Sequence, residues 1–274
     1  MIKLATPISH LFADSEAAKT IINVSDCLEC RDRTIENTSE NQELFHCELE
    51  PIHQLSDEDF LYLKDIKRRK KGLKLITFHM ATSCTEPSLE FSKIKSGVFE
   101  LGGRSYSRDE MLENAKKNLA KIKSIFGGEI KIALENNNYY PTDAYRYITD
   151  ADFITQVIND NDVYFLFDIA HAQVTAHNKG IEFEVYKNQL PLERVIQIHI
   201  CSPFIPDVAV DAKLSKNIAY DAHNYPDEFK LNEVRNIMEN YSTVQYLTVE
   251  YYRDVMGLVR SIGEVRKVAN MNNH

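Results

Sequence analysis

Imidazole and carboxylate side chains in this sequence stand where short apolar runs turn polar. The stretch FDIAHAQVTAHNKG, residues 167–180, places Asp168 and His171 directly after the apolar run VYFLF. The stretch YDAH places Asp221 and His223 two residues apart, so both lie on one face of an extended strand. Imidazole nitrogen and carboxylate oxygen together favour iron, zinc or manganese over calcium or magnesium. These two segments therefore predict metal binding.

The same two residue types recur at the ends of other apolar runs. The expected ligands are His79, Glu135, Asp168, His171, His199, Asp221, His223 and Glu250. If these eight groups met at one place, their desolvation and mutual repulsion would be costly unless cations neutralised the carboxylates. Eight donors exceed the needs of one tetrahedral or octahedral ion. We therefore expect two or three metal ions, with Glu135 or Glu250 as a bridging carboxylate.

Alternating strands and helices must position these side chains. Near-continuous apolar runs predict parallel strands that are buried on both faces. They span residues 3–8, 44–51, 74–81, 129–136, 163–170, 194–201, 217–223 and 245–252. Between them, segments such as 107–126 have helical spacing, and Ser107 with Glu110 forms a capping-box pattern. The alternation predicts a (β/α)8 TIM barrel in a single domain, 1–274, with its active site at the carboxyl ends of the strands.

The composition favours a globular protein without membrane spans. Hydrophobic residues make up 43% of the chain, which is enough for a large core. The chain has no signal-peptide pattern and no apolar run near the roughly 20 residues of a membrane span, so we expect a cytoplasmic protein with no membrane contact. Five scattered cysteines are expected as free thiols, and the lone CLEC motif at 27–30 is weak support for zinc. The net charge of −9 makes nucleic acid an unfavoured partner.

At these residues the sequence resembles the xylose-isomerase-like TIM barrels. Within that group it is most similar to the multinuclear non-haem iron-dependent oxidases that modify cysteines of ribosomally made peptides. The resemblance is carried by LENNNYY (134–140), by FDIAHAQVTAHNKG with VYKNQLPLERVIQIHI (185–200), and by YDAHNYP (220–226). The chain departs from the family pattern in having no second histidine between the third and fourth expected strands. It also has Ala170 and His171 at positions where the family commonly has asparagine, and Lys179 where it has histidine.

The resemblance implies an iron-dependent oxidase that acts on a peptide or a small thiol, with zinc or manganese as alternative metals. It also implies a separate partner protein that presents the peptide. Similarity to sugar isomerases and epimerases and to endonuclease IV-type phosphodiesterases leaves those reactions open, and a non-catalytic metal-dependent scaffold is a further alternative. Glu135, Glu250 and His171 are the expected catalytic residues. Substrate contacts are expected from Asn136, Tyr140, His177, Asn178 and Arg253. His46 and Glu48 end the second expected strand and are expected at the rim, outside the ligand set.

Overall fold

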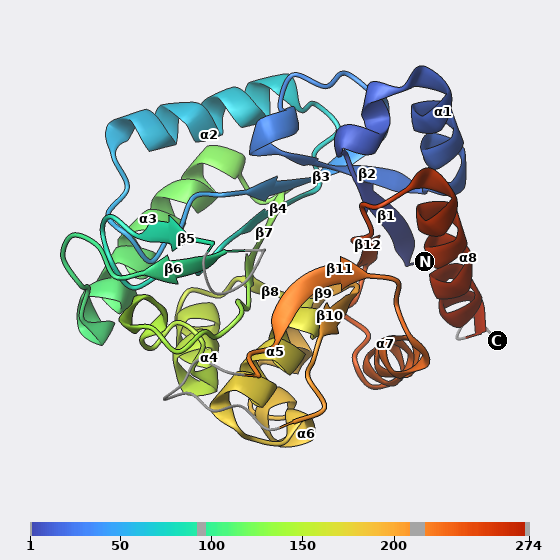
Figure 1. Ribbon diagram of the computed structural model, residues 1–274. Helices are drawn as coiled ribbons and strands as arrows, with labels where there is room; N and C mark the ends of the chain where they lie inside the picture. Colours follow the sequence, from blue (N-terminus) through green and yellow to red (C-terminus); the bar gives the residue numbers. More distant parts are fainter. Residues whose placement is uncertain (1, 92–96, 209–216, 272–274) are drawn as a thin grey trace.

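A computed structural model describes residues 2–91, 97–208 and 217–271 of the chain. Its parallel strands close into a barrel in the order β1-β12-β9-β8-β7-β4-β3-β2 (Figure 1), which confirms the predicted TIM-barrel fold. The barrel strands are β1 (Lys3–Pro7), β2 (Cys27–Arg31), β3 (Gln42–Cys47), β4 (Leu75–Phe78), β7 (Lys131–Glu135), β8 (Tyr164–Asp168), β9 (Val195–Ile200) and β12 (Tyr246–Val249).

Helices surround the barrel (Figure 1). They are α1 (Ser15–Val24), α2 (Asp57–Arg69), α3 (Arg108–Phe126), α4 (Ala151–Asp160), α5 (Ile169–Lys179), α6 (Phe183–Lys187), α7 (Glu228–Asn240) and α8 (Val255–Met271). The predicted capping box begins α3, since Ser107 Oγ accepts from the Glu110 amide and Glu110 accepts from the Ser107 amide. Helices α1 and α8 come from opposite ends of the chain and pack side by side (Figure 1). Among the helices described, none combines the length and apolar character that crossing a bilayer requires.

One expected barrel strand is wrong and another was missed. The segment expected at 217–223 forms β11 (Tyr220–Asn224), which pairs antiparallel with β10 (Ser202–Phe204) outside the barrel. The eighth barrel strand is instead β2, which contains the CLEC motif and lies between β1 and β3. This strand was not expected because Glu29 and Arg31 interrupt its apolar residues. The five cysteines are buried free thiols, as expected.

A ring of apolar side chains fills the barrel interior below its mouth. Each barrel strand contributes one member, and the ring consists of Ala5, Cys27, Leu44, Leu75, Ala133, Leu166, Ile196 and Tyr246. In a strand, the residue two positions further on faces the same side. At β2, β3, β7 and β8 this next residue is Glu29, His46, Glu135 or Asp168, all buried. The barrel interior therefore changes from an apolar floor to a polar mouth within one pleat.

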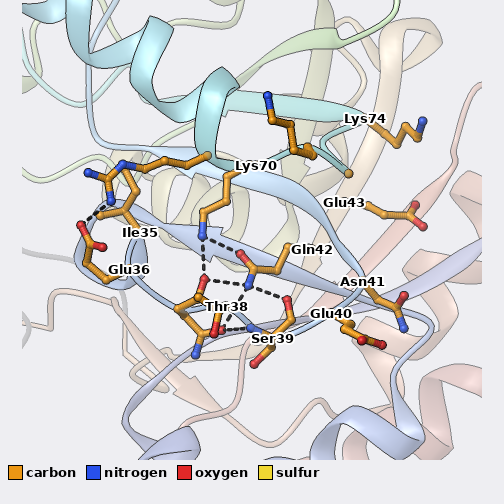
Figure 2. A pocket seen from close by; sticks show the side chains of 14 residues that line it. Ile35, Glu36, Thr38, Ser39, Glu40, Asn41, Gln42, Glu43, Lys70 and Lys74 are labelled. Carbon is orange, nitrogen blue, oxygen red and sulfur yellow. Dashed lines mark hydrogen bonds and ion pairs between the residues drawn. The ribbon is translucent and has the colours of Figure 1, made fainter.

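A hollow of about 600 Å³ lies at the opposite end of the barrel, near the start of β3 and the end of α2 (Figure 2). Figure 2 shows Lys70 reaching into it, where Nζ donates to Gln42 Oε1 at 2.7 Å and to the Asn37 carbonyl at 2.9 Å. These bonds tie the helix end to the strand start. Since TIM-barrel active sites lie at the carboxyl ends of strands, we assign this end a structural role.

Candidate metal centre

Imidazole and carboxylate groups gather at the barrel mouth in three neighbouring groups. The first group consists of His46, His79 and Glu135. His46 Nε2 lies 3.3 Å from Glu135 Oε2, and His79 Nδ1 lies 3.2 Å from the same oxygen. Thr77 Oγ1 is 2.6 Å from His46 Nδ1 and so fixes the orientation of that ring. Burial lowers the pKa of His79 to about 3, which leaves its imidazole neutral and able to bind a cation.

The second group is formed by Glu135, Asp168 and His199. Glu135 takes part through its other oxygen, because Oε1 lies 3.2 Å from His199 Nδ1. Asp168 Oδ1 accepts from the His171 amide at 2.7 Å and caps helix α5, which leaves Oδ2 facing the centre. Burial raises the pKa of Asp168 to about 7. Glu135 thus offers one oxygen to each of two groups, which is the geometry of a bridging carboxylate.

The third group consists of Asp221 and His223 from strand β11, together with His171 and Glu250. His223 Nε2 is 3.1 Å from Asp221 Oδ2, and His171 Nε2 is 3.7 Å from that oxygen. His171 Nδ1 lies 2.8 Å from the Asn136 carbonyl, which can only accept, so Nδ1 carries a proton and Nε2 is the nitrogen that can bind a cation. Although burial opposes it, Asp168 raises the pKa of His171 well above its usual value, so a cation at Nε2 would displace a proton. Glu250 Oε2 lies 3.6 Å from His223 Nε2 and 3.5 Å from His199 Nδ1, and therefore joins this group to the second.

All eight expected ligands lie in these groups, and the hairpin outside the barrel supplies Asp221 and His223. Cys201 Sγ is 3.5 Å from Asp221 Oδ1, so this thiol borders the third group. His223 has a φ of 44°, in the left-handed region that is uncommon for a residue other than glycine. Strained backbone of this kind concentrates at functional sites. The assignment of the eight residues as ligands stays a prediction.

Three residues that lie among the proposed ligands were not expected there, namely His46, Glu29 and Arg31. His46 was expected at the rim, yet its side chain is buried and its ring centroid lies 4.3 Å from that of His79. It supplies a second imidazole beside His79, which the expected ligand set lacked. Glu29 and Arg31 were not expected at the centre because they make β2 too polar to be predicted as a buried strand. The signal that could have found them is the alternation of CLECR, in which Glu29 and Arg31 follow Cys27 at steps of two.

Glu29 and Arg31 contact proposed ligands and orient them: Glu29 contacts His199, and Arg31 contacts Glu250. Glu29 Oε2 lies 3.2 Å from His199 Nε2, so the carboxylate holds the proton on Nε2 and directs Nδ1 toward the centre. Although burial favours the neutral acid, His199 and Arg31 hold the pKa of Glu29 at about 2. Arg31 Nη2 donates to Glu29 Oε1 at 2.8 Å and also to Glu250 Oε1. Tyr252 donates to the same Glu250 oxygen at 2.9 Å, which leaves Oε2 toward the histidines.

The residues expected to contact substrate have mostly structural partners. The Asn136 amide bonds the backbone of Asp168 in both directions, at 3.0 and 2.9 Å. Asn178 bonds the backbone of Ala219 and thereby anchors the chain that leads into β11. His177 Nε2 lies 2.9 Å from the Asn217 carbonyl.

The other two expected substrate residues differ in their placement. Tyr140 is buried against Tyr145, with ring centroids 5.3 Å apart. Arg253 is exposed at the rim and donates to Asn224 at the end of β11. Substrate contact by these two residues, and by Asn136, His177 and Asn178, stays a prediction.

The donor set fits metal ions. Asp168 Oδ2 and His199 Nδ1 are buried, face each other at 3.9 Å and have no hydrogen-bond partner among the described residues. A buried polar atom without a partner is costly, and a cation between these two atoms would satisfy both. The second nitrogens of His46, His171 and His199 are held by hydrogen-bond partners of the kind that orient metal-ligating imidazoles.

Comparisons with known proteins agree with this geometry. The sequence model of the family described as RiPP precursor modification enzyme MbnB/TglH/ChrH matches residues 104–272, which is more than half of the chain. A UPF0276 protein of Shewanella loihica (strain ATCC BAA-1088 / PV-4) is 22% identical over 144 residues, which cover 53% of this chain and 50% of that protein. The chain therefore matches about half the length of this curated relative.

Several solved structures share the fold. A xylose isomerase domain containing protein from Salmonella typhimurium LT2 superposes with a TM-score of 0.59 at 11% identity, covering 99% of this chain and 97% of that one. Endonuclease IV from Thermus thermophilus gives 0.55 at 11% identity, covering 98% and 99%. D-Psicose 3-epimerase from Clostridium cellulolyticum H10 gives 0.54 at 10% identity, covering 99% and 98%. These likenesses confirm the xylose-isomerase-like TIM-barrel fold. By its match over residues 104–272, the chain belongs to the RiPP precursor modification enzyme family MbnB/TglH/ChrH.

Proposed function

We propose that this enzyme is an iron-dependent oxidase that modifies a thiol of a peptide substrate, with two or three ions at the barrel mouth. The observation that carries the proposal is the sharing of Glu135 and Glu250 among three groups of ligand atoms. A peptide substrate is supported by membership of a family of precursor modification enzymes. A separate partner protein that presents the peptide is part of the proposal.

The first group, His46, His79 and Glu135, would hold one ion. Asp168, His199 and the second oxygen of Glu135 would hold another. A third would lie among the third-group residues, which are His171, Asp221, His223 and Glu250. When bound, iron supplies the redox chemistry that thiol oxidation requires.

The protein itself supplies orientation, charge balance and control of protons. Arg31 and Tyr252 both bond Glu250 Oε1, so this oxygen is occupied and Oε2 is the one available at the centre. The Asn136 carbonyl accepts the proton of His171 Nδ1, so Nε2 is the nitrogen from which a bound cation would displace the proton. The proposed catalytic roles of Glu135, Glu250 and His171 are therefore to position the reacting groups and to fix where protons reside.

A single-ion sugar epimerase is the main alternative. Such a site would use residues like Glu135, Asp168, His199 and Glu250 and would leave Asp221 and His223 without a role. The 3.1 Å approach of the Asp221 and His223 ligand atoms supports more than one ion. An endonuclease IV-type phosphodiesterase would use the full set, but family membership supports a peptide substrate.

Metal analysis of protein purified without oxygen tests the proposal. Two or three irons per chain, with oxygen consumption in the presence of a cysteine-containing peptide, would support it. One manganese per chain would instead support the epimerase, and three zincs the phosphodiesterase.

The variants His199→Ala and Asp221→Ala should each lose metal and activity. Glu43→Gln is a matched control, because Glu43 pairs with Lys3 at 2.6 Å near the other end of the barrel. If both site variants kept full metal content and activity, the proposed centre would be wrong.

A further inference from the structure

A cavity of about 750 Å³ opens beside the ligand groups, and its size suits a small ligand or one end of a peptide. It is bounded by residues at or just after the carboxyl ends of β1, β2, β3, β4 and β12. Its lining includes His79, Arg31, Arg33 and Tyr252. Since His79 also belongs to the first ligand group, a molecule in this cavity lies next to the proposed centre.

Arg31 is built to bind an anion in this cavity. Its Nε and Nη2 atoms are fixed on Glu29 Oε1 at 3.2 and 2.8 Å, and Nη2 also contacts Glu250. Among the described residues, none accepts from Nη1, and 27% of the side chain is exposed. Protein carboxylates therefore occupy Nε and Nη2, and the two N–H groups of Nη1 are left for a ligand in the cavity. A donor fixed in this way loses little conformational entropy when it binds a ligand.

Arg33 adds a second, looser cation at the same cavity. Its side chain is 87% exposed, and it pairs with Glu48 at 3.3 Å. Exposed pairs of this kind are weak, so a ligand anion can replace Glu48 at little cost. Asp32 stands between the two arginines and anchors this segment, because its carboxylate accepts from the Glu48 amide at 2.6 Å and from Tyr62. Arg31, at the end of β2, and Arg33, in the turn that follows, thus flank the cavity on one anchored segment.

We propose that this cavity binds a carboxylate of the substrate through Arg31 and Arg33. A carboxylate has two oxygens, so one can accept from Arg31 Nη1 and the other from Arg33. It can be a carboxyl terminus or an acidic side chain next to the reacting residue. The identity of the reacting group rests on the proposed function, but recognition of the carboxylate does not.

Equilibrium binding without turnover tests the inference. The probes are N-acetylcysteine, its neutral carboxamide, and N-acetyl-aspartyl-cysteinamide, titrated by calorimetry into the oxygen-free holoenzyme. We expect N-acetylcysteine to bind at least about tenfold more tightly than the carboxamide, a difference of about 1.4 kcal/mol. Tighter binding of the aspartyl amide than of N-acetylcysteine would identify an acidic side chain as the source of the carboxylate. The reverse order would identify a carboxyl terminus.

Two variants test whether Arg31 and Arg33 cause the preference for the acid over the carboxamide. Arg33→Gln should reduce the preference for the acid about threefold and leave the metal content unchanged, because Arg33 is exposed. Arg31→Lys keeps a positive charge but loses the Nη1 donors, and should remove most of the preference. Arg69→Gln is the control, because Arg69 lies near the other end of the barrel, where it pairs with Glu36.

Equal binding of N-acetylcysteine, the aspartyl amide and the neutral carboxamide by the wild-type enzyme would overturn the inference. An unchanged preference in both Arg33→Gln and Arg31→Lys would overturn it too. If iron binding and oxygen consumption persisted in either case, only this inference would fail. If the preference were present but iron were absent, the proposed function would fail and the anion site would stand.

Discussion

Replacing Glu29 by glutamine should weaken metal binding although Glu29 is not among the expected ligands. Glu29 is fully buried, and its Oε2 lies 3.2 Å from His199 Nε2. The same carboxylate accepts from Gln197 at 2.6 Å and pairs with Arg31 at 2.8 Å. Glutamine keeps the shape but removes the negative charge that makes His199 a stronger ligand. It also places an amide donor among groups that already donate.

The size of the effect follows from these contacts. Loss of a hydrogen-bond partner behind a metal-ligating histidine costs about 10–100-fold in metal affinity. At about 1.36 kcal/mol for each factor of ten, this is roughly 1.4–2.7 kcal/mol. The loss should approach the upper end, because Arg31 also loses its carboxylate partner and then competes for Glu250.

Competition with a chromophoric chelator measures this affinity directly, and metal content per chain measures occupancy. Glu43→Gln is the control: it removes a carboxylate from β3, the strand next to β2, that contacts no proposed ligand. If Glu29→Gln bound metal within twofold of the wild type, the support of His199 by Glu29 would be refuted. An equal loss in Glu43→Gln would show that the effect is not specific to the mouth.

Other perturbations give separate tests. His46→Asn should lower the metal content by about one ion per chain, because it removes a donor 3.3 Å from Glu135, and unchanged content would exclude His46 as a ligand. Asn178→Ala should lower the free energy of unfolding by about 2–4 kcal/mol in urea titrations, because its buried amide makes bonds of 2.8–3.0 Å to Tyr139 and Ala219; a loss below about 0.5 kcal/mol would contradict this anchoring role. Metal affinity should rise at least about fivefold from pH 6 to pH 7, since burial raises the pKa of Asp168 to about 7 and only its deprotonated form binds a cation. Chelator competition at each pH checks this sign, and an affinity independent of pH would contradict it.

Much of the fold was predictable because strand periodicity and helix caps are local. The apolar runs at β4, β7, β8, β9 and β12 identified five strands that meet at the mouth, and the ends of these runs identified most of the proposed ligands. The barrel strand β2 escaped because its polar residues are buried by pairing with other residues of the mouth. Burial of this kind depends on partners far away in the sequence, such as His199 for Glu29.

The sequence by itself determined which residue types stand at the carboxyl ends of the strands, because alternation along a strand depends only on neighbouring positions. Only the tertiary structure decided how these residues group, since grouping depends on distances between strands. It brought His46 beside His79 and directed the two oxygens of Glu135 to different neighbours. Asp221 and His223, expected on a barrel strand, lie instead on a hairpin outside the barrel, and they still reach the same centre. Barrel closure is the physical reason, because it converts separate strand ends into one ring of side chains.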